Sequence, residues 1–198
     1  KGKDTKVTEV SFSGAGGKST KVTKVKEMTF DKDTGKLKTE TAYKDGKVAQ
    51  KTEHLKDGSE KMTHYDLKSG KKLSESKFDS RGKGYTEHHD KQGNVEARTE
   101  VVEPGSITKE IKFNKDGSKV ETETKKGTVK TQEGGRVDAS EEVREEVNKN
   151  GGVERRVVTR VVGKEKTVKD TKFNEDGSSK TTETKGGKVT ASEERNAD

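Results

Sequence analysis

Glycine recurs in this sequence at intervals of 11 or 12 residues, and this spacing restricts the fold more than any other feature. Most of these glycines close a short polar cluster, such as Lys44-Asp45-Gly46. Such clusters supply the left-handed residue that a tight hairpin turn requires. The roughly eight residues between clusters match a usual strand length. The spacing therefore predicts an all-β fold, an elongated antiparallel β-meander of hairpin repeats. The turn glycines are Gly35, Gly46, Gly58, Gly70, Gly82, Gly93, Gly105 and Gly117.

The chain has few residues with which to build a core. Val, Leu, Ile and Phe account for 31 of 198 residues, whereas 41% of the residues are charged. So few apolar side chains cannot offset an ordering cost of about 1–2 kcal/mol per residue in a two-layer fold. We therefore expect a single-layer sheet that meets water on both faces. Cross-strand Lys–Glu and Thr–Thr pairs would hold it together at about 0.2–1 kcal/mol each. Intrinsic disorder is the alternative that this composition leaves open.

An internal repeat supports a fold built by duplication of hairpins. Residues 109–133 and 169–193 are identical at 14 of 25 positions, and residues 30–41 and 78–82 hold shorter versions. We expect three segments. Residues 1–29 contain N-terminal strands with a Gly-rich connector, and residues 30–133 contain the regular hairpin repeats. Residues 134–198 contain more apolar hairpins and the second copy of the long repeat.

The last third of the chain allows two secondary structures. Val143 and Val147 lie four residues apart, which is the spacing of one helix face, so a helix over 140–148 is an alternative. Valine prefers strands, and apolar residues alternate with polar ones beyond this stretch. We therefore expect strands here, and Val153 to Val162 is the expected place for a localised apolar patch.

Aromatic side chains precede several of the expected turns. Phe30, Phe78, Phe113 and Phe173 each stand immediately before a turn cluster. Aromatic cross-strand pairs are the strongest contacts available to such a chain. We expect these four rings to cover the ends of the hairpins.

Two loops resemble ligand-binding motifs but fail their pattern. The stretch 14–20, GAGGKST, lacks the first glycine of a phosphate-binding loop, because that position holds Phe12, and a strand rather than a helix is expected after it. The stretch 31–35, DKDTG, begins like a calcium loop, but its twelfth position is Ala42 instead of Glu. We expect a connector at 14–20 and a hairpin turn at 31–35.

The histidines do not form a metal-site pattern. His88 and His89 are adjacent and would point to opposite faces of a strand. With a turn at Asp57-Gly58, His54 would face Lys61 and not His64. We therefore expect no metal site, no catalytic residue and no cofactor site, and the chain is not expected to be an enzyme.

The charge of the chain and the residue types that it lacks restrict the classes of binding partner that we expect. The net charge of +7 arises from 44 basic and 37 acidic residues that are finely mixed, and aromatics are sparse, so no nucleic-acid partner is expected. No run of apolar residues is long enough for a transmembrane segment. The chain has no Cys, which fits a surface or matrix protein. It starts with Lys1, from which we expect a mature product or a fragment.

The turn phrases resemble one known family. IKFNKDG at 111–117 and TKFNEDG at 171–177, each followed by TETK within a few residues, are similar to the Lys/Glu-rich hairpins of spirochaete outer surface protein A and its relatives. This resemblance implies a freestanding sheet exposed to water on both faces. The family's N-terminal lipid-anchoring Cys is absent from this sequence. The Lys-Asp-Gly-x-Val rhythm also resembles bacterial hairpin-repeat proteins.

These features together favour a non-enzymatic extracellular structural protein. It would be a fibre, adhesive or matrix component at the cell surface or outside the cell, assembling with copies of itself through edge strands. A bacterial surface protein that binds a host or matrix partner through its exposed sheet is the alternative. A designed repeat sheet is a third interpretation, which the imperfect repeats disfavour.

Overall fold

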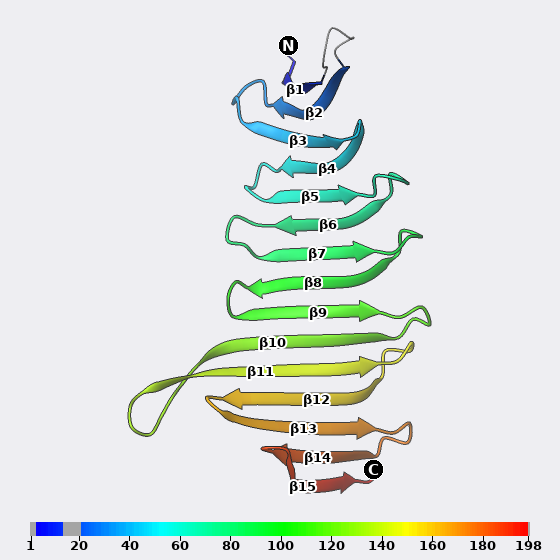
Figure 1. Cartoon of the computed structure of the whole chain (residues 1–198). Helices are drawn as coiled ribbons and strands as arrows, with labels where there is room; N and C mark the ends of the chain where they lie inside the picture. Colours follow the sequence, from blue (N-terminus) through cyan, green and yellow to red (C-terminus); the bar gives the residue numbers. More distant parts are fainter. Residues whose placement is uncertain (1–2, 14–20, 198) are drawn as a thin grey trace. The chain divides into compact units, whose positions relative to one another are not determined.

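The computed structural model describes residues 3–13 and 21–197. In these residues it contains fifteen β-strands and no helix, and strands that follow one another in sequence are neighbours in one open antiparallel sheet (Figure 1). The predicted all-β meander is confirmed. The strands are β1 Thr5–Ser13, β2 Lys21–Phe30, β3 Leu37–Lys44, β4 Lys47–His54, β5 Glu60–Tyr65, β6 Lys72–Phe78, β7 Gly84–His89, β8 Val95–Glu103, β9 Ile107–Phe113, β10 Lys119–Lys130, β11 Arg136–Val147, β12 Val153–Val162, β13 Glu165–Phe173, β14 Ser179–Lys185 and β15 Lys188–Arg195.

The chain divides into two compact units, Lys1–Val95 and Glu96–Asp198. This boundary lies inside the segment 30–133 that the repeats define. Compactness and repeat regularity are therefore different criteria, and the three-segment division stays a prediction.

Glycines in the left-handed region close the hairpins. All eight turn glycines named from the spacing have φ between +67° and +98°. Among the described residues that are not glycine, Asp45 alone has a positive φ, at +52°. Left-handed backbone is accessible to Gly at no steric cost and to Asp at a small one, so the glycine that closes each cluster places the turn.

Four turn types connect the described strands, and one of them is the three-residue turn 104–106, in which the N–H of Ser106 donates to the carbonyl of Glu103. The commonest has five residues, in which the first N–H bonds the fifth carbonyl and a glycine at position four bonds back to the first carbonyl. Six-residue turns occupy 31–36 and 66–71, and two-residue turns occupy 45–46, 163–164 and 186–187. The five-residue turns are 55–59, 79–83, 90–94, 114–118, 131–135, 148–152 and 174–178.

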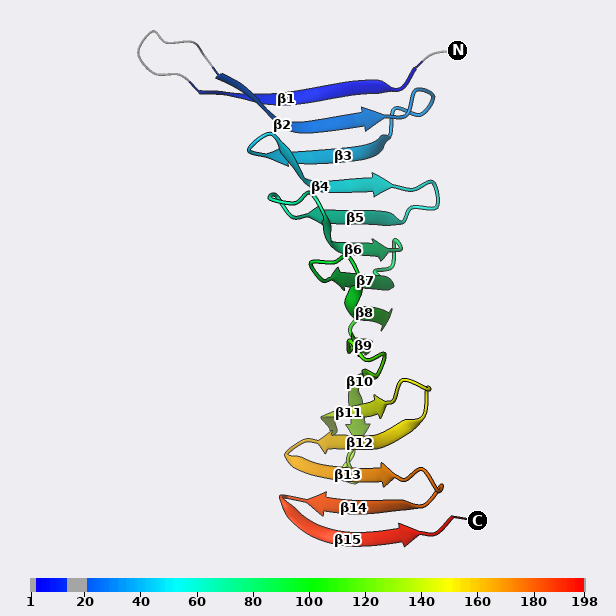
Figure 2. The same cartoon turned by 90° about the vertical axis from the view of Figure 1, so that its right-hand side faces the viewer.

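Each unit is one layer thick, so the fold has almost no core. Figure 2 shows β8, β9 and β10 nearly end-on, without a second layer against them. Among the described residues, Val147 is the only buried apolar side chain, and the others that are buried are Thr52, Ser59 and Thr63. The accessible surface is 14359 Å², whereas a globular protein of 21.7 kDa exposes roughly 9,200 Å².

Long charged side chains shield the short ones in this sheet. Thr63 of β5 lies between Lys51 of β4 and Glu75 of β6, its directly opposite neighbours. Glu75 in turn binds Lys61 at 3.1 Å and Lys72 at 2.6 Å. The aliphatic stems of such residues cover apolar surface while their charges stay in water. Threonines that are buried in this way, such as Thr63, therefore take the place of a conventional apolar core.

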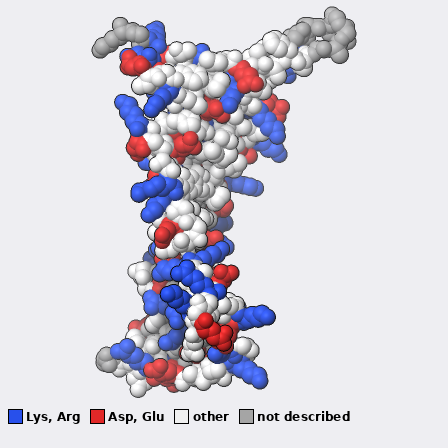
Figure 3. Space-filling view, turned by 90° about the vertical axis from the view of Figure 1, so that its left-hand side faces the viewer, with Lys and Arg blue, Asp and Glu red and all other residues white. Residues whose placement is uncertain are grey.

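Opposite charges continue across neighbouring strands in the second unit. Glu141 of β11 lies directly opposite Lys125 on one side and Arg160 on the other. Arg155 grips Asp170 with two hydrogen bonds of 3.0 and 2.7 Å, and this contact lowers the pKa of the carboxyl. Figure 3 shows both signs of charge mixed over the visible surface. The stability of the sheet thus comes from many small cross-strand terms.

The segment 140–148 is not helical. It lies mostly in β11, whose Val143 is directly opposite Val158 of β12. A β-branched pair of this kind packs well on a pleated surface. The strand interpretation is confirmed, and the helix alternative is excluded.

The four phenylalanines before turns do lie at strand ends, but they differ in burial. Phe30 and Phe78 are half-buried, whereas Phe113 is 41% exposed and Phe173 is 36% exposed. Phe78 stands opposite Gly84, where an added Cβ would lie 1.9 Å from the carbonyl oxygen of Lys77. The phenylalanines at strand ends are therefore more buried in the first unit than in the second.

Candidate functional site

The first strand forms an open edge of the sheet. β1 pairs with β2 on one side and has no strand on the other side in the described part of the chain. All nine of its residues are exposed, it contains no Pro, and Lys6 and Glu9 are its only charged residues. Natural edge strands are commonly protected by Pro, by several charges or by short length. β1 has none of these protections.

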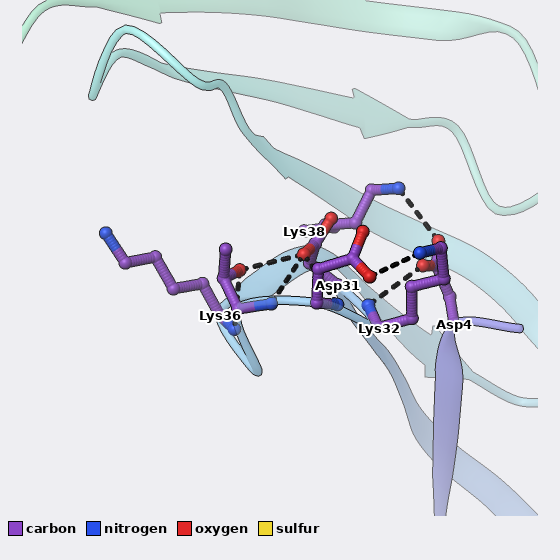
Figure 4. Close-up of polar contacts among 7 residues, drawn as sticks. Asp4, Asp31, Lys32, Lys36 and Lys38 are labelled. Atoms are coloured by element: carbon purple, nitrogen blue, oxygen red, sulfur yellow. Dashed lines mark hydrogen bonds and ion pairs between the residues drawn. The ribbon is translucent and has the colours of Figure 1, made fainter. Parts of the chain in front are cut away.

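A carboxylate ties the start of this edge to the interior of its unit (Figure 4). Asp4 accepts hydrogen bonds from the backbone N–H of Lys32 at 3.1 Å and from Nζ of Lys38 at 2.8 Å. The Lys38 contact is the main cause that lowers the pKa of Asp4. Because Lys38 belongs to β3, this contact reaches past β2 and anchors β1 in the sheet.

The last strand forms the other open edge. All eight residues of β15 are exposed, and Val189 is 67% exposed. Its pairing with β14 is interrupted at Thr190, whose hydroxyl donates to the carbonyl of Glu183 at 3.3 Å. Glu194 holds Lys180 at 2.6 Å. β15 is therefore fastened to its neighbour on one side and open on the other.

A two-stranded arm extends from the second unit (Figure 1). β9 pairs with β10 only up to Lys125, and β12 pairs with β11 only from Ala139 onward. Residues 126–138, here called the arm, pair along their strands only within the β10–β11 hairpin, where Lys126 and Gly127 lie opposite Ser140 and Ala139 at the base. The flanking turns contact the arm at its base through the backbone. The N–H of Lys126 donates to the carbonyl of Ser106 at 2.7 Å, and the N–H of Gly163 donates to the carbonyl of Asp138 at 2.9 Å. The arm is a second place with free strand edges.

The first unit also carries an aromatic hollow of about 690 Å³. Tyr43 and Val48, which are directly opposite, line it together with Tyr65. Register shifts in the pairing next to Tyr43 and next to Tyr65 accompany the hollow, and such bulges redirect side chains. Nζ of Lys24 lies 4.5 Å above the ring of Tyr43. The lining also includes Lys47, Lys51 and Lys68 together with Asp66, so the rim carries both signs of charge, and the tyrosines suit an aromatic group of a partner.

Other described apolar side chains are more exposed than those at the expected place of the apolar patch. The valines of β12, from Val153 to Val162, are all half-buried in the sheet. Their neighbours on β11 and β13 cover them. The large apolar side chains with the highest exposure are instead Phe12 at 69%, Val189 at 67% and Val22 at 56%. Sequence pattern alone misses this because an edge position follows from topology and not from local hydrophobicity.

The loops that resembled ligand motifs are resolved in part. The stretch 14–20 lies outside the described residues. In the 31–36 turn, Oδ1 of Asp31 accepts from the N–H groups of Asp33 at 3.1 Å and Thr34 at 2.9 Å, and from the Thr34 hydroxyl (Figure 4). These bonds lower the pKa of Asp31. The carboxylate therefore stabilises the turn, as predicted for a hairpin connection.

The histidines occupy different places from one another. His54 lies opposite Glu60, with Nδ1 3.0 Å from Oε1, so the prediction that it faces Lys61 is wrong. The turn has five residues, and the register is therefore one residue different from a turn centred on Asp57-Gly58. His64 and His88 both lie opposite Ser74, on either side of it. Within the described ranges, no group of three or more His, Cys, Asp or Glu residues is arranged to hold a metal ion.

The described residues include no helix that is long and apolar enough to span a membrane. Comparison with protein-family models and with curated proteins finds no match to this chain.

Proposed function

We propose that this protein is a non-enzymatic structural protein that assembles with copies of itself through its open strand edges. It would serve as a fibre, adhesive or matrix component at the cell surface or outside the cell. The observation that carries the proposal is the fully exposed edge of β1, which contains no Pro and only two charged residues. An exposed edge presents a row of unpaired N–H and C=O groups, which is a template for another strand.

The energetics of the sheet also support assembly. Each hairpin gains stability only from its direct neighbours, because the described residues form a single layer with one buried apolar side chain. In such a fold the terminal strands are the least stabilised, since they have one neighbour instead of two. Pairing with a second copy would give β1 or β15 the missing neighbour. The cross-strand charge pairs would make this pairing weaker at high salt.

The test is the assembly of edge variants. Thr8→Pro removes one backbone donor in the middle of β1, and Thr8→Ala is the matched control that keeps the donor. We expect the wild type and Thr8→Ala to form oligomers or filaments at low salt, seen by light scattering and electron microscopy, and Thr8→Pro to form fewer. Circular dichroism of each variant establishes that the sheet is intact. Strictly monomeric wild-type protein at millimolar concentration and low salt would contradict the proposal.

The aromatic hollow favours a second function, that of a bacterial surface protein that binds a host or matrix partner. Tyr43, Val48 and Tyr65 lie on one open face of the first unit. Tyrosines that combine apolar area with a hydroxyl are enriched at interfaces. If the protein is monomeric, Tyr65→Ser is expected to abolish binding to extracellular-matrix extracts, while Leu73→Ser, another exposed apolar position on the same unit, is expected to leave it unchanged.

A further inference from the structure

One face of the arm is apolar and contains a notch. Val129 lies directly opposite Val137, and Gly127 lies directly opposite Ala139. Residues that are opposite, or two apart along a strand, project from the same face of a sheet. Val162 of β12, opposite Ala139, continues the row. The glycine and the alanine form a floor between larger side chains, and the resulting hollow measures about 290 Å³.

The walls of the notch differ in character. Val129 and Val137 form the wall that is nearer to the tip of the arm. On the opposite side stands the charged row of Lys125, Glu141 and Arg160, in which Nε of Arg160 donates to Glu141 at 3.0 Å. No Cβ would meet another atom within 4 Å at Gly127, so the floor is open. A cation beside an apolar floor favours an aromatic occupant over an aliphatic one.

The chain carries a matching knob on the β1–β2 hairpin. Phe12 is the most exposed large apolar side chain among the described residues, at 69%. Its direct neighbour Val22 is 56% exposed, and Val10, two residues away on the same face, is 36% exposed. A closed apolar cavity of about 150 Å³ already accommodates benzene, so the notch has room for a phenyl ring.

We infer that Phe12 of one copy inserts into the notch over Gly127 and Ala139 of another copy. This inference rests on the proposed self-assembly and names one contact that directs it. The knob and the notch are different surfaces of the same chain, so the contact is head-to-tail. A heterologous contact that does not close a ring adds copies without limit and produces a filament. One inserted ring buries less than the roughly 1,200 Å² of a standard interface, so the contact acts together with edge pairing.

Two substitutions test the contact from its two sides. Phe12→Ser removes the knob, and Gly127→Leu fills the notch. The Gly127 backbone is not left-handed, so a leucine is compatible with the strand there. We expect each variant to raise the concentration needed for half-maximal assembly at least about tenfold, as measured by sedimentation. Leu73→Ser, which also removes an exposed apolar side chain, is the control that leaves this concentration unchanged.

Cross-linking identifies the partners directly, because the chain has no native Cys. Val22→Cys protein, which keeps Phe12, is mixed with Val129→Cys protein, which keeps Gly127, and oxidised, and in a parallel sample with Leu73→Cys protein. We expect the first mixture to form the mixed disulfide dimer at least about tenfold faster than the second. Equal rates, or assembly that survives both Phe12→Ser and Gly127→Leu yet is lost in Thr8→Pro, would overturn the knob contact and leave edge assembly standing. Wild-type protein that never assembles would overturn both.

Discussion

The two copies of the long repeat are identical at 14 of 25 positions but end differently. Both begin with a strand that ends in Phe-Asn and a five-residue turn. In the first copy Asp116 accepts from the N–H of Ser118 at 2.9 Å, and in the second Asp176 accepts from the N–H of Ser178 at 2.8 Å. The following strands then separate. β10 runs for twelve residues, whereas β14 ends after seven and turns into β15.

At the position where the two strands begin to differ in length, the two sequences differ by a single residue. The first copy has Lys125-Lys126-Gly127, and the second has Lys185-Gly186-Gly187. Gly186 and Gly187 have φ of +57° and +82°, which is the pair of left-handed residues that a two-residue turn of this type needs. Gly127 has no positive φ and remains in the strand. Because Lys126 does not supply the first left-handed residue, the first copy continues into the arm.

The comparison teaches that strand length in this sheet is decided by turn chemistry and not by packing. Neither copy buries a core, so no tertiary contact compensates for an unsuitable turn residue. The same rule accounts for Lys44-Asp45-Gly46-Lys47, where Asp45 takes the left-handed position with φ +52°. Four predictions follow from this rule, in order of decreasing effect.

The largest effect is expected from threonine at the two equivalent glycines of the repeat. Gly187→Thr forces a β-branched residue into the left-handed region and should lower the free energy of unfolding by about 1–3 kcal/mol. Gly127→Thr, at the equivalent position in the first copy, should not lower the free energy of unfolding. Denaturant unfolding of the two variants measures this difference. Equal destabilisation by both would show that the two glycines have the same role and would break the comparison.

The next effect concerns the first turn residue. Gly186→Lys reproduces the sequence of the first copy and should cost about 1–2 kcal/mol, because lysine is strained at a positive φ. Gly186→Asp reproduces the Asp45 turn and should cost less. Protease cleavage near β15, followed by mass spectrometry, reports whether the hairpin has opened. Greater opening in Gly186→Asp than in Gly186→Lys would contradict the explanation.

A smaller effect of opposite sign is expected at the base of the arm. Gly127→Ala should raise the free energy of unfolding by about 0.5–1 kcal/mol, since glycine in a strand loses more chain entropy on folding. The added methyl group meets no atom within 4 Å. Thermal unfolding measures the change, with Gly93→Ala, at φ +98°, as a destabilised reference. A fall in stability for Gly127→Ala would mean that its backbone differs from an ordinary strand.

The smallest effect should be the same in both copies. Hydrogen bonds from Ser118 and Ser178 lower the pKa of Asp116 and Asp176 in the folded chain. A lowered pKa stabilises the fold above the unfolded value of about 3.9, and this stability is lost as the pH falls below it. Asp116→Asn and Asp176→Asn should therefore weaken the acid dependence of unfolding to equal extents. Unequal slopes below pH 4 would show that the two turns differ.

Much of the fold is predictable from the sequence because the turns carry local signals. A short cluster that ends in Gly sets a turn without help from distant residues, and all eight glycines of the regular spacing are left-handed, although only three of them directly follow Asp. The small number of apolar residues likewise predicts a single layer. Strand pairing then follows from chain order, since a meander needs no long-range topology.

The candidate surfaces are less predictable, because they depend on where strands end. Gly127 looks like the turn glycine Gly187, yet only the residue before each one separates a strand from a turn. The arm and its notch follow from that difference. Similarly, Phe12 becomes a knob because β1 is an edge strand, and His54 meets Glu60 because its turn has five residues. Such one-residue differences in register lie beyond what periodicity can resolve.

We infer that Lys126 keeps the first copy in the strand, and nuclear Overhauser contacts test this explanation. In the wild-type protein, the account predicts cross-strand contacts between the backbone protons of Val129 and Val137, which are directly opposite in the arm. Contacts between Lys125 and Thr128, with none between Val129 and Val137, would place a two-residue turn at Lys126-Gly127. That result would contradict the account.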